Sequence, residues 1–229
     1  MVDQCIPTLS TPLLLKQVRD VFDEIADHRQ LKKMTISLAD DLMSGLAVFA
    51  LKCPSLLKFD EQREESHIRH NLHHLYGIAS APCDTQLRAI LDPVIPSALH
   101  PAYHALLACV NRAGVLERFR FLEGTFLLAV DVTTPFLSST IHCDDCATKT
   151  TRSGERLYYH QLLAAAIVHP DLKQVLPVTP EPILGGDGER KNDGELSAAK
   201  RLLPRVYQDH PGCRFTVFED ALFANGPHI

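Results

Sequence analysis

The sequence of 229 residues has no apolar run long enough to form a membrane helix. Its longest unbroken apolar stretch, Leu162–Val168, is far shorter than the roughly 20 residues that such a helix needs. The first ten residues lack a basic segment followed by an apolar one, so we expect no secretion signal. These absences predict a cytoplasmic globular protein with no membrane partner.

An excess of positive charge is also missing. Twenty-three Lys and Arg stand against 28 Asp and Glu, a net charge of −5. This balance argues against a protein that coats nucleic acid with its whole surface, although a local basic patch stays open. The seven cysteines are an odd number and are spread along the chain, so we expect free thiols rather than a disulfide framework.

The chain up to about residue 120 has the spacing of helices. Thr11 followed by Pro12 is typical of a helix start, and Ser37 with Asp40 resembles a capping box before a second helix. That second helix should end near Pro54. Further helices are expected over about 66–76, 85–91 (after Asp84) and 98–110. This pattern predicts a helical N-terminal domain over residues 1–120.

After residue 120 the pattern changes to that of strands. The apolar run Phe126–Val130 suits a central strand that is buried on both faces. Leu157–Val168 predicts a second strand, and Gln174–Ile183, with three prolines, predicts a short edge strand. A helix over about 192–208 and a strand Phe215–Phe218 follow. The pattern over 121–229 is β-β-β-α-β, so we expect an α+β or α/β fold.

Two acids, Asp131 and Asp220, come at the C-terminal ends of predicted strands. Ligands of open α/β sheets gather at such ends, and two carboxylates there would offer the hard oxygen ligands that Mg²⁺ or Mn²⁺ prefers. Two such ions about 4 Å apart support in-line attack on a phosphodiester. The simpler alternative is that each acid caps the next turn. Glu219 alternates to the other face of its strand and is the weaker candidate ligand.

Short motifs around both acids, and others in the same order along nearly the whole chain, carry a resemblance to a known family. Leu128–Thr133, Phe136–Ser139 and Ile141–Cys143 resemble the first acidic motif of DDE-type transposases of bacterial insertion sequences, and Glu219–Leu222 with Asn225 and Pro227–Ile229 resembles the second. The segments that continue the resemblance are Ser37–Asp40, Lys52–Leu57, Asp84–Arg88, Leu91–Pro93, Tyr158–Gln161, Ile167–Asp171, Pro180–Ile183, Lys191–Asp193 and Ala198–Leu203.

The resemblance implies an incomplete ribonuclease-H-like core behind a helical domain that helps to contact DNA. Asp131 and Asp220 would be the catalytic acids that hold Mg²⁺ or Mn²⁺. The implied activity is metal-dependent cleavage at the ends of the element, followed by strand transfer. The implied partners are the terminal inverted repeats, target DNA and further copies of the chain, in the nucleoid-associated cytoplasm of a bacterium.

The chain departs from the family at two points. The third acid, a Glu on a later helix, should lie well beyond Asp220, but nine residues follow and none is acidic. Val132 stands where the resemblance predicts Gly. We therefore expect a fragment or a truncated product that does not catalyse full transposition. The alternatives are a non-catalytic DNA-binding or interaction module, which occupies element ends or inhibits the full-length enzyme, and a ribonuclease-H-like nuclease with no role in transposition.

Cysteine and histidine suggest two further metal sites. Cys143 and Cys146 form a CxxC pair, and with His160 and either His142 or His169 they could bind a structural Zn²⁺. A single CxxC is a weak signal, and a thiol pair without a metal is the simpler interpretation. Four histidines crowd one predicted helix, where two of them, four residues apart, could share a metal; an exposed polar face is the simpler interpretation. They are His67, His70, His73 and His74.

Basic residues occur in small groups that could contact phosphates in a salt-dependent way. No zinc-finger, bZIP or clear helix-turn-helix pattern identifies a helix that reads DNA. The groups are Arg29, Lys32 and Lys33; Arg63 and Arg69; Arg112, Arg118 and Arg120; Lys149 and Arg152; Arg190 and Lys191; and Lys200, Arg201 and Arg205.

Overall fold

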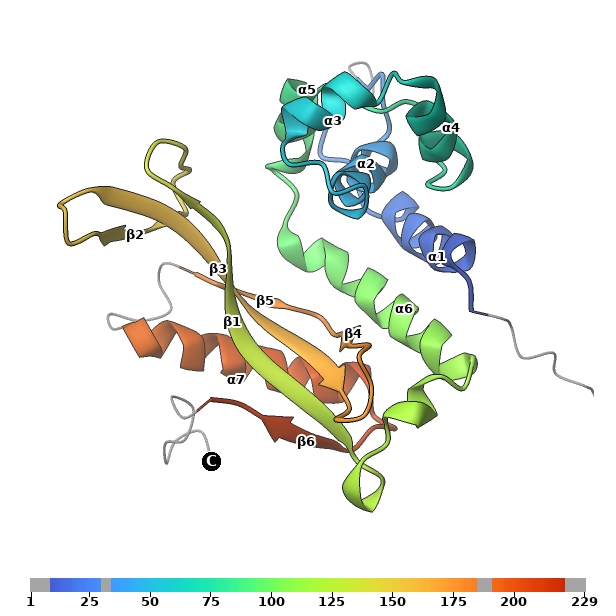
Figure 1. The fold of residues 1–229 in the computed structure, drawn as a ribbon, viewed down its shortest axis with the longest axis vertical. Coiled ribbons are helices and arrows are strands. Elements are labelled where there is room, and N and C mark those ends of the chain that lie inside the picture. The colour runs from blue at the N-terminus through green and yellow to red at the C-terminus, as the bar shows by residue number, and fades with distance from the viewer. Residues whose placement is uncertain (1–8, 30–33, 185–190, 221–229) are drawn as a thin grey trace, which may run out of the picture. The chain divides into compact units, whose positions relative to one another are not determined.

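The computed structural model describes residues 9–29, 34–184 and 191–220, with side chains described from 194 onward in the last range. The chain divides into two compact units, Met1–Ala113 and Gly114–Ile229. Each unit is described by itself (Figure 1). Within the described residues, no helix has the length and apolar character that crossing a membrane would require.

The first unit is helical. Its core is formed by large apolar side chains that are almost completely buried, among them Met43, Phe59 and Leu87. Removing these side chains from water supplies the main driving force for the unit, at about 25 cal/mol per Å² of apolar surface. Its helices are α1 (Thr11–Asp23), α2 (Leu38–Ala50), α3 (Leu56–Gln62), α4 (Ser66–His74), α5 (Asp84–Leu91), a 3₁₀ turn (Pro96–Leu99) and α6 (His100–Arg112).

Local signals at the helix starts are partly confirmed. The Ser37 side chain accepts a hydrogen bond from the backbone N–H of Asp40 at 3.1 Å, so the predicted cap of α2 is confirmed. The caps predicted at Thr11 and Asp84 are wrong, because both residues lie inside their helices and follow Ser10 and Cys83. Prolines are tolerated throughout the first turn, where N–H groups have no intrahelical acceptor, so Pro12 does not mark the first residue.

The spacing of apolar residues did not predict α3. Ser55 precedes this helix and accepts a hydrogen bond from the backbone N–H of Lys58, which caps it. Phe59 is its one buried residue, so its seven residues carry too short an apolar pattern to be recognised from periodicity. Ser55 was the residue in the sequence that could have indicated the start of this helix.

The second unit contains a mixed sheet and one long helix. Its strands are β1 (Phe126–Ser138), β2 (Ala147–Thr150), β3 (Arg156–Val168), β4 (Leu176–Pro177), β5 (Glu181–Ile183) and β6 (Phe215–Phe218); α7 (Lys191–Asp209) precedes β6. The strand order is β2-β3-β1-β6, and β4 and β5 also pair with β3. β6 is parallel to β1, whereas the other pairs are antiparallel. With the helical first unit, this sheet confirms an α+β protein.

One face of this sheet packs against α7 (Figure 1). Leu128 of β1 and Leu163 of β3 are completely buried there together with Leu202 of α7. Pro204 lies inside α7 without ending it, and its side chain is exposed. The predicted edge strand over 174–183 is instead two short strands, β4 and β5, because proline cannot donate to the ladder and interrupts pairing.

Candidate functional site

The two predicted catalytic acids follow the paired segments of the parallel strands β1 and β6. Ala129 of β1 is the partner of Phe218 of β6. The pairing ends there, and each acid comes two residues later: Asp131 within β1 and Asp220 beyond the end of β6. Asp131 is exposed, and its Oδ1 accepts a hydrogen bond from the backbone N–H of Val132 at 2.7 Å. The prediction that Asp131 ends its strand is wrong, because β1 continues past it to Ser138, whereas Asp220 comes two residues after the end of β6.

The alternation of side chains decides which face each acid occupies. Val130 is buried on the face that packs against α7, so Asp131 faces the opposite, open side. Glu219, which follows the end of β6, is half-buried and its Oε1 is buried, whereas Asp220 is exposed. Val132 is half-buried and pairs with the buried Leu163, so its side chain also turns away from the acids.

The open face offers hard oxygen ligands for a divalent cation. The carboxylates of Asp131 and Asp220 are the ligand type that Mg²⁺ and Mn²⁺ prefer. Two acids alone are a small donor set, and the remaining positions would be taken by water, substrate phosphate or other chain segments. The residues present therefore fit a partly built site for such an ion.

A second cluster brings together two thiols and an imidazole. His160 Nε2 lies 3.3 Å from the Sγ of Cys143 and 3.3 Å from the Sγ of Cys146, and the two sulfurs are 3.6 Å apart. Among the described residues, these three form the one group of at least three His, Cys, Asp or Glu ligand atoms that all lie within 4.8 Å of one another. The cysteines are free thiols, since a disulfide would require about 2.05 Å between the sulfurs. The cluster could bind a metal.

The two histidines suggested as a fourth ligand lie outside this group. His169 comes just after the far end of β3, nine residues or about 30 Å of strand from His160. Its ring makes an edge contact with Phe121. His142 stacks on the ring of Tyr158 at 4.3 Å, and its Nδ1 is 3.2 Å from the Thr140 carbonyl oxygen. The prediction of His169 as a ligand is wrong, because strand geometry carries it away.

The cluster belongs to a β-hairpin arm, which we define as residues 134–160. The arm contains the outer ends of β1 and β3 together with β2 (Figure 1). The pairing of β1 with β3 shifts register between Thr133 and Phe136, where β1 has one more residue than β3. Beyond this bulge Phe136 pairs with His160. No residue of the arm is buried.

The Cys143 thiol is unfavourable as a thiolate unless a cation is bound. Desolvation raises the pKa of the Cys143 thiol, and neighbouring Cys146 raises it further because two thiolates at this separation would repel each other. A divalent cation reverses that preference, since it binds thiolates.

The histidine-rich helix α4 lines a polar cleft of about 500 Å³ in the first unit. The rings of His70 and His74 are 4.2 Å apart, and those of His73 and His74 are 4.8 Å apart. These imidazoles contact one another by their rings and form no three-ligand cluster of the kind found on the arm. The described residues therefore favour the simpler interpretation of a polar helix face.

Several basic residues that were candidates for phosphate contact are held in ion pairs. Arg201 Nε lies 2.6 Å and Arg205 Nη1 lies 2.5 Å from the carboxylate of Glu181, which is 6% exposed. This contact ties α7 to β5. Arg201 and Arg205 are four residues apart and so lie on one face of the helix, and this spacing was the sequence feature that could have predicted a shared acidic partner. Arg63 pairs with Asp60 and Glu64, Arg29 with Asp27, and Arg120 with Glu117.

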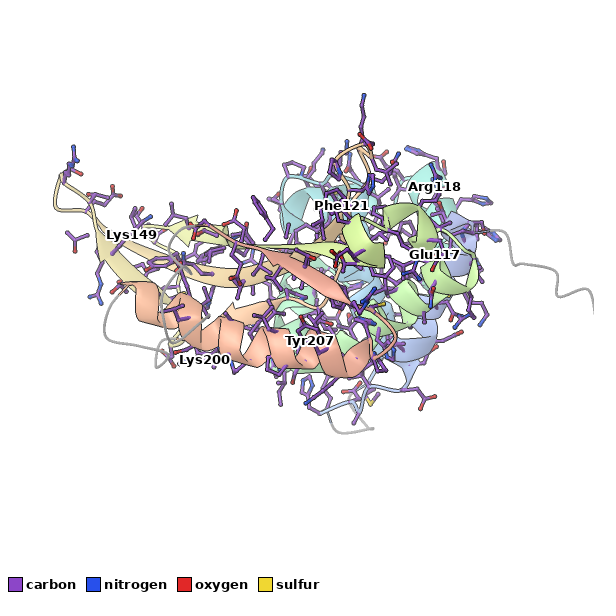
Figure 2. All side chains as sticks on the ribbon, turned by 90° about the horizontal axis from the view of Figure 1, so that it is seen from below. Glu117, Arg118, Phe121, Lys149, Lys200 and Tyr207 are labelled. Carbon is purple, nitrogen blue, oxygen red and sulfur yellow. The ribbon has the colours of Figure 1, made fainter. Side chains whose placement is uncertain are left out.

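The arm carries basic residues that form no ion pair among the described residues. They are Lys149, Arg152 and Arg156, and Lys149 is labelled on the arm in Figure 2. Lys149 lies over the ring of Tyr159 at 5.4 Å and Arg156 over that of Tyr158 at 5.4 Å. These side chains combine exposed positive charge with aromatic surface.

Comparison with known proteins adds no relative: no protein-family model, curated protein or solved structure matches this chain.

Proposed function

We propose that the chain is the N-terminal part of a DDE-type transposase, whose Asp131 and Asp220 hold Mg²⁺ or Mn²⁺ for cleavage of DNA. The observation that supports the proposal is the parallel pairing of β1 with β6, since each acid follows the last paired residue of its strand by two residues. In a ribonuclease-H-like core the first acid lies on the first strand and the second on the fourth. Support comes from the succession of β1, β3 and the β4–β5 edge, then α7 and a strand parallel to β1.

The roles of the chain's own groups follow from their positions. Asp131 and Asp220 bind the cation and orient it toward the open face, where a phosphodiester can approach without crossing α7. A bound Mg²⁺ or Mn²⁺ supplies activation of water and stabilisation of the leaving oxygen. The basic residues of the arm, Lys149, Arg152 and Arg156, are suited to contact the DNA backbone. The third acid of the family is absent from this chain, so full transposition needs a segment beyond it.

Metal binding tests the proposal on the 229-residue chain itself. Titration with Mn²⁺, followed by electron paramagnetic resonance, should detect a site that Asp131→Asn and Asp220→Asn each weaken by at least about 10-fold. Glu219→Gln and Asp171→Asn are the matched controls and should leave Mn²⁺ binding unchanged, because the Oε1 of Glu219 is buried and Asp171 lies on an exposed turn. Equal binding by wild type, Asp131→Asn and Asp220→Asn would contradict the proposal.

A second candidate function is a non-catalytic DNA-binding module, which the exposed basic arm favours. In this case the chain binds plasmid DNA in a salt-sensitive way, and Asp131→Asn and Asp220→Asn leave that binding intact. The two functions separate when the chain is extended by a segment with the third acid. Mn²⁺-dependent nicking of supercoiled plasmid that either aspartate substitution abolishes supports the enzyme, whereas binding without nicking supports the module.

A further inference from the structure

We propose that Cys143, Cys146 and His160 bind one Zn²⁺ ion, which takes its fourth ligand from water and fixes the loop between β1 and β2 to β3. The ligand set and its test do not depend on the transposase proposal. The ion is a structural clasp for the arm, separate in ligand type from the carboxylate site at Asp131 and Asp220.

The distances within the cluster are those of three corners of a zinc tetrahedron. With Zn–S bonds of about 2.3 Å and a Zn–N bond of about 2.0 Å, tetrahedral geometry places two sulfurs about 3.8 Å apart and sulfur and nitrogen about 3.5 Å apart. The Sγ atoms of Cys143 and Cys146 are 3.6 Å apart, and each lies 3.3 Å from Nε2 of His160. The observed separations are about 0.2 Å shorter than the tetrahedral values, so the three ligand atoms are close enough to share one ion.

The backbone around the CxxC pair is already arranged for metal-bound sulfur. Cys146 N–H donates to the Cys143 carbonyl oxygen at 3.2 Å, which closes a turn, and Cys143 N–H is 3.4 Å from the Sγ of Cys146. A backbone N–H directed at a sulfur stabilises that sulfur as a thiolate, the form in which cysteine binds metal. The turn therefore presents both sulfurs to the side of β3 that carries His160.

The donor types select the metal. Two thiolates and an imidazole are ligands for zinc, whereas Mg²⁺ and Mn²⁺ prefer oxygen. Two thiolates also neutralise the charge of Zn²⁺. Cys143 is exposed, and within the described residues no other histidine, cysteine or carboxylate joins the group, so water completes the tetrahedron.

The arm needs such a clasp because it has no core. No residue from Asp131 to Leu162 is buried, although the buried face resumes at Leu163. Small segments without a hydrophobic core are commonly stabilised by a metal or a disulfide, and these two cysteines are not bonded to each other. Binding energy from the ion would then supply the order of the loop.

The position of the clasp relates it to the open face of the sheet. His160 and Ala164 are an even number of residues apart on β3, so they share a face, and Ala164 is the partner of Asp131. Four residues of strand separate the two levels by about 13 Å. The zinc clasp therefore holds the arm in place beside the face where the acids lie.

The first experiment measures metal in the 229-residue chain, purified under reducing conditions without an affinity tag, by inductively coupled plasma mass spectrometry. We expect one zinc per chain, and Co²⁺ substitution should give the absorption of thiolate-bound tetrahedral cobalt. Cys143→Ser, Cys146→Ser and His160→Asn should each lower Zn²⁺ affinity by on the order of 100-fold or more. Cys83→Ser and His142→Gln are controls that should retain the ion.

Several results would overturn the proposal. These are a chain that takes up no Zn²⁺, a chain that binds copper in its place, an intact mass that reveals a Cys143–Cys146 disulfide after purification with reductant, and retention of zinc by Cys143→Ser. Loss of zinc in His142→Gln would overturn the water-completed site, because it would make that imidazole the fourth ligand.

The clasp role is tested on the unaltered chain, so that misfolding of a variant does not confuse the result. Hydrogen exchange measured by mass spectrometry should become at least 10-fold faster over residues 139–150 when a chelator removes the metal, while α7 keeps its protection. Unchanged exchange over 139–150 after complete removal of zinc would overturn the clasp role.

Discussion

Arg29 Nη1 lies 3.6 Å from Oδ2 of Asp41, and neither carboxylate oxygen of Asp41 has a hydrogen-bond partner in the part of the chain that the structure describes. The side chain of Asp41 is 0% exposed. Desolvation raises the pKa of Asp41 to about 7; Arg29 opposes this rise, and the neighbouring Asp40 adds to it. A distant ion pair therefore does not compensate for burial, and Asp41 takes up a proton on folding.

This burial predicts that Asp41 lowers stability as the pH rises. The folded chain binds more protons than the unfolded chain between the ordinary pKa of 3.8 and the raised value of about 7. In that window the free energy of unfolding falls with pH, by about 1.4 kcal/mol per unit. Asp41→Asn removes the effect, so it should be more stable than wild type at pH 8 by about 4 kcal/mol and nearly equal to it at pH 4.

Urea denaturation from pH 4 to 8 measures the difference between the two proteins. Asp20→Asn is the control, since Asp20 is half exposed and pairs with Lys16 on the surface of α1. Its difference from wild type should stay within about 1 kcal/mol. A pH-independent difference between wild type and Asp41→Asn would contradict the raised pKa.

Glu181→Ala should destabilise the second unit. The substitution leaves Arg201 and Arg205 without the acid that ties α7 to β5. Removing one partner of a buried ion pair costs about 3 kcal/mol or more. Glu61→Ala, which breaks an exposed pair with Lys58, should cost less than about 1 kcal/mol. Chemical denaturation of both variants provides the comparison, and equal small losses would show that Glu181 is not a structural tie.

The caps of α1 and α2 allow a paired test. Ser37→Ala removes a hydrogen bond to the backbone N–H of Asp40 and should cost about 1 kcal/mol of unfolding free energy. Ser10 precedes α1 but makes no side-chain capping bond, so Ser10→Ala should change stability by only a few tenths of a kcal/mol. Thermal unfolding of the two variants reads this difference. A larger loss for Ser10→Ala would reverse the assignment of caps.

The basic arm predicts a salt-dependent contact with DNA. Replacing Lys149, Arg152 and Arg156 together by Ala should weaken binding to plasmid DNA. Affinity falls as salt concentration rises, and each lost phosphate contact should make the negative slope of log affinity against log salt concentration shallower by about 0.9. Fluorescence anisotropy at several salt concentrations gives that slope. Lys58→Ala is the control, because Lys58 is paired with Glu61 on α3; an unchanged slope in the triple variant would remove the arm from the DNA contact.

Local patterns predicted most of the regular elements. The prediction that Phe126–Val130 is buried on both faces is wrong, because its residues are buried on the α7 side and half-buried on the other. In Leu157–Val168 this alternation begins only at Leu163. The elements that were missed, α3 and β2, are short. β2 consists of half-buried and exposed residues, so it has no apolar pattern and is defined by its pairing with β3.

The sequence predicted the residue types of each candidate site, but it predicted which of them lie together only where they are close in the chain. Spacing alone brought Cys143 and Cys146 together, since a CxxC turn is local, and His160 joins them through the β1–β3 hairpin. His169 could not be excluded by counting residues, because only the straight course of β3 shows how far it is carried. The parallel pairing of β1 with β6, which precedes Asp131 and Asp220, likewise joins strands that are separated by the rest of the unit.

The sequence by itself determined where most of the longer helices and strands form and which residue types could bind metal, because these properties depend on neighbours within a few residues. The tertiary structure alone decided partners. It set the register of β1 with β6, gave Arg201 and Arg205 to Glu181 rather than to a ligand, and left Asp41 buried with a distant arginine. Such contacts join residues far apart in the chain, and their free energy depends on the burial and distance that packing creates.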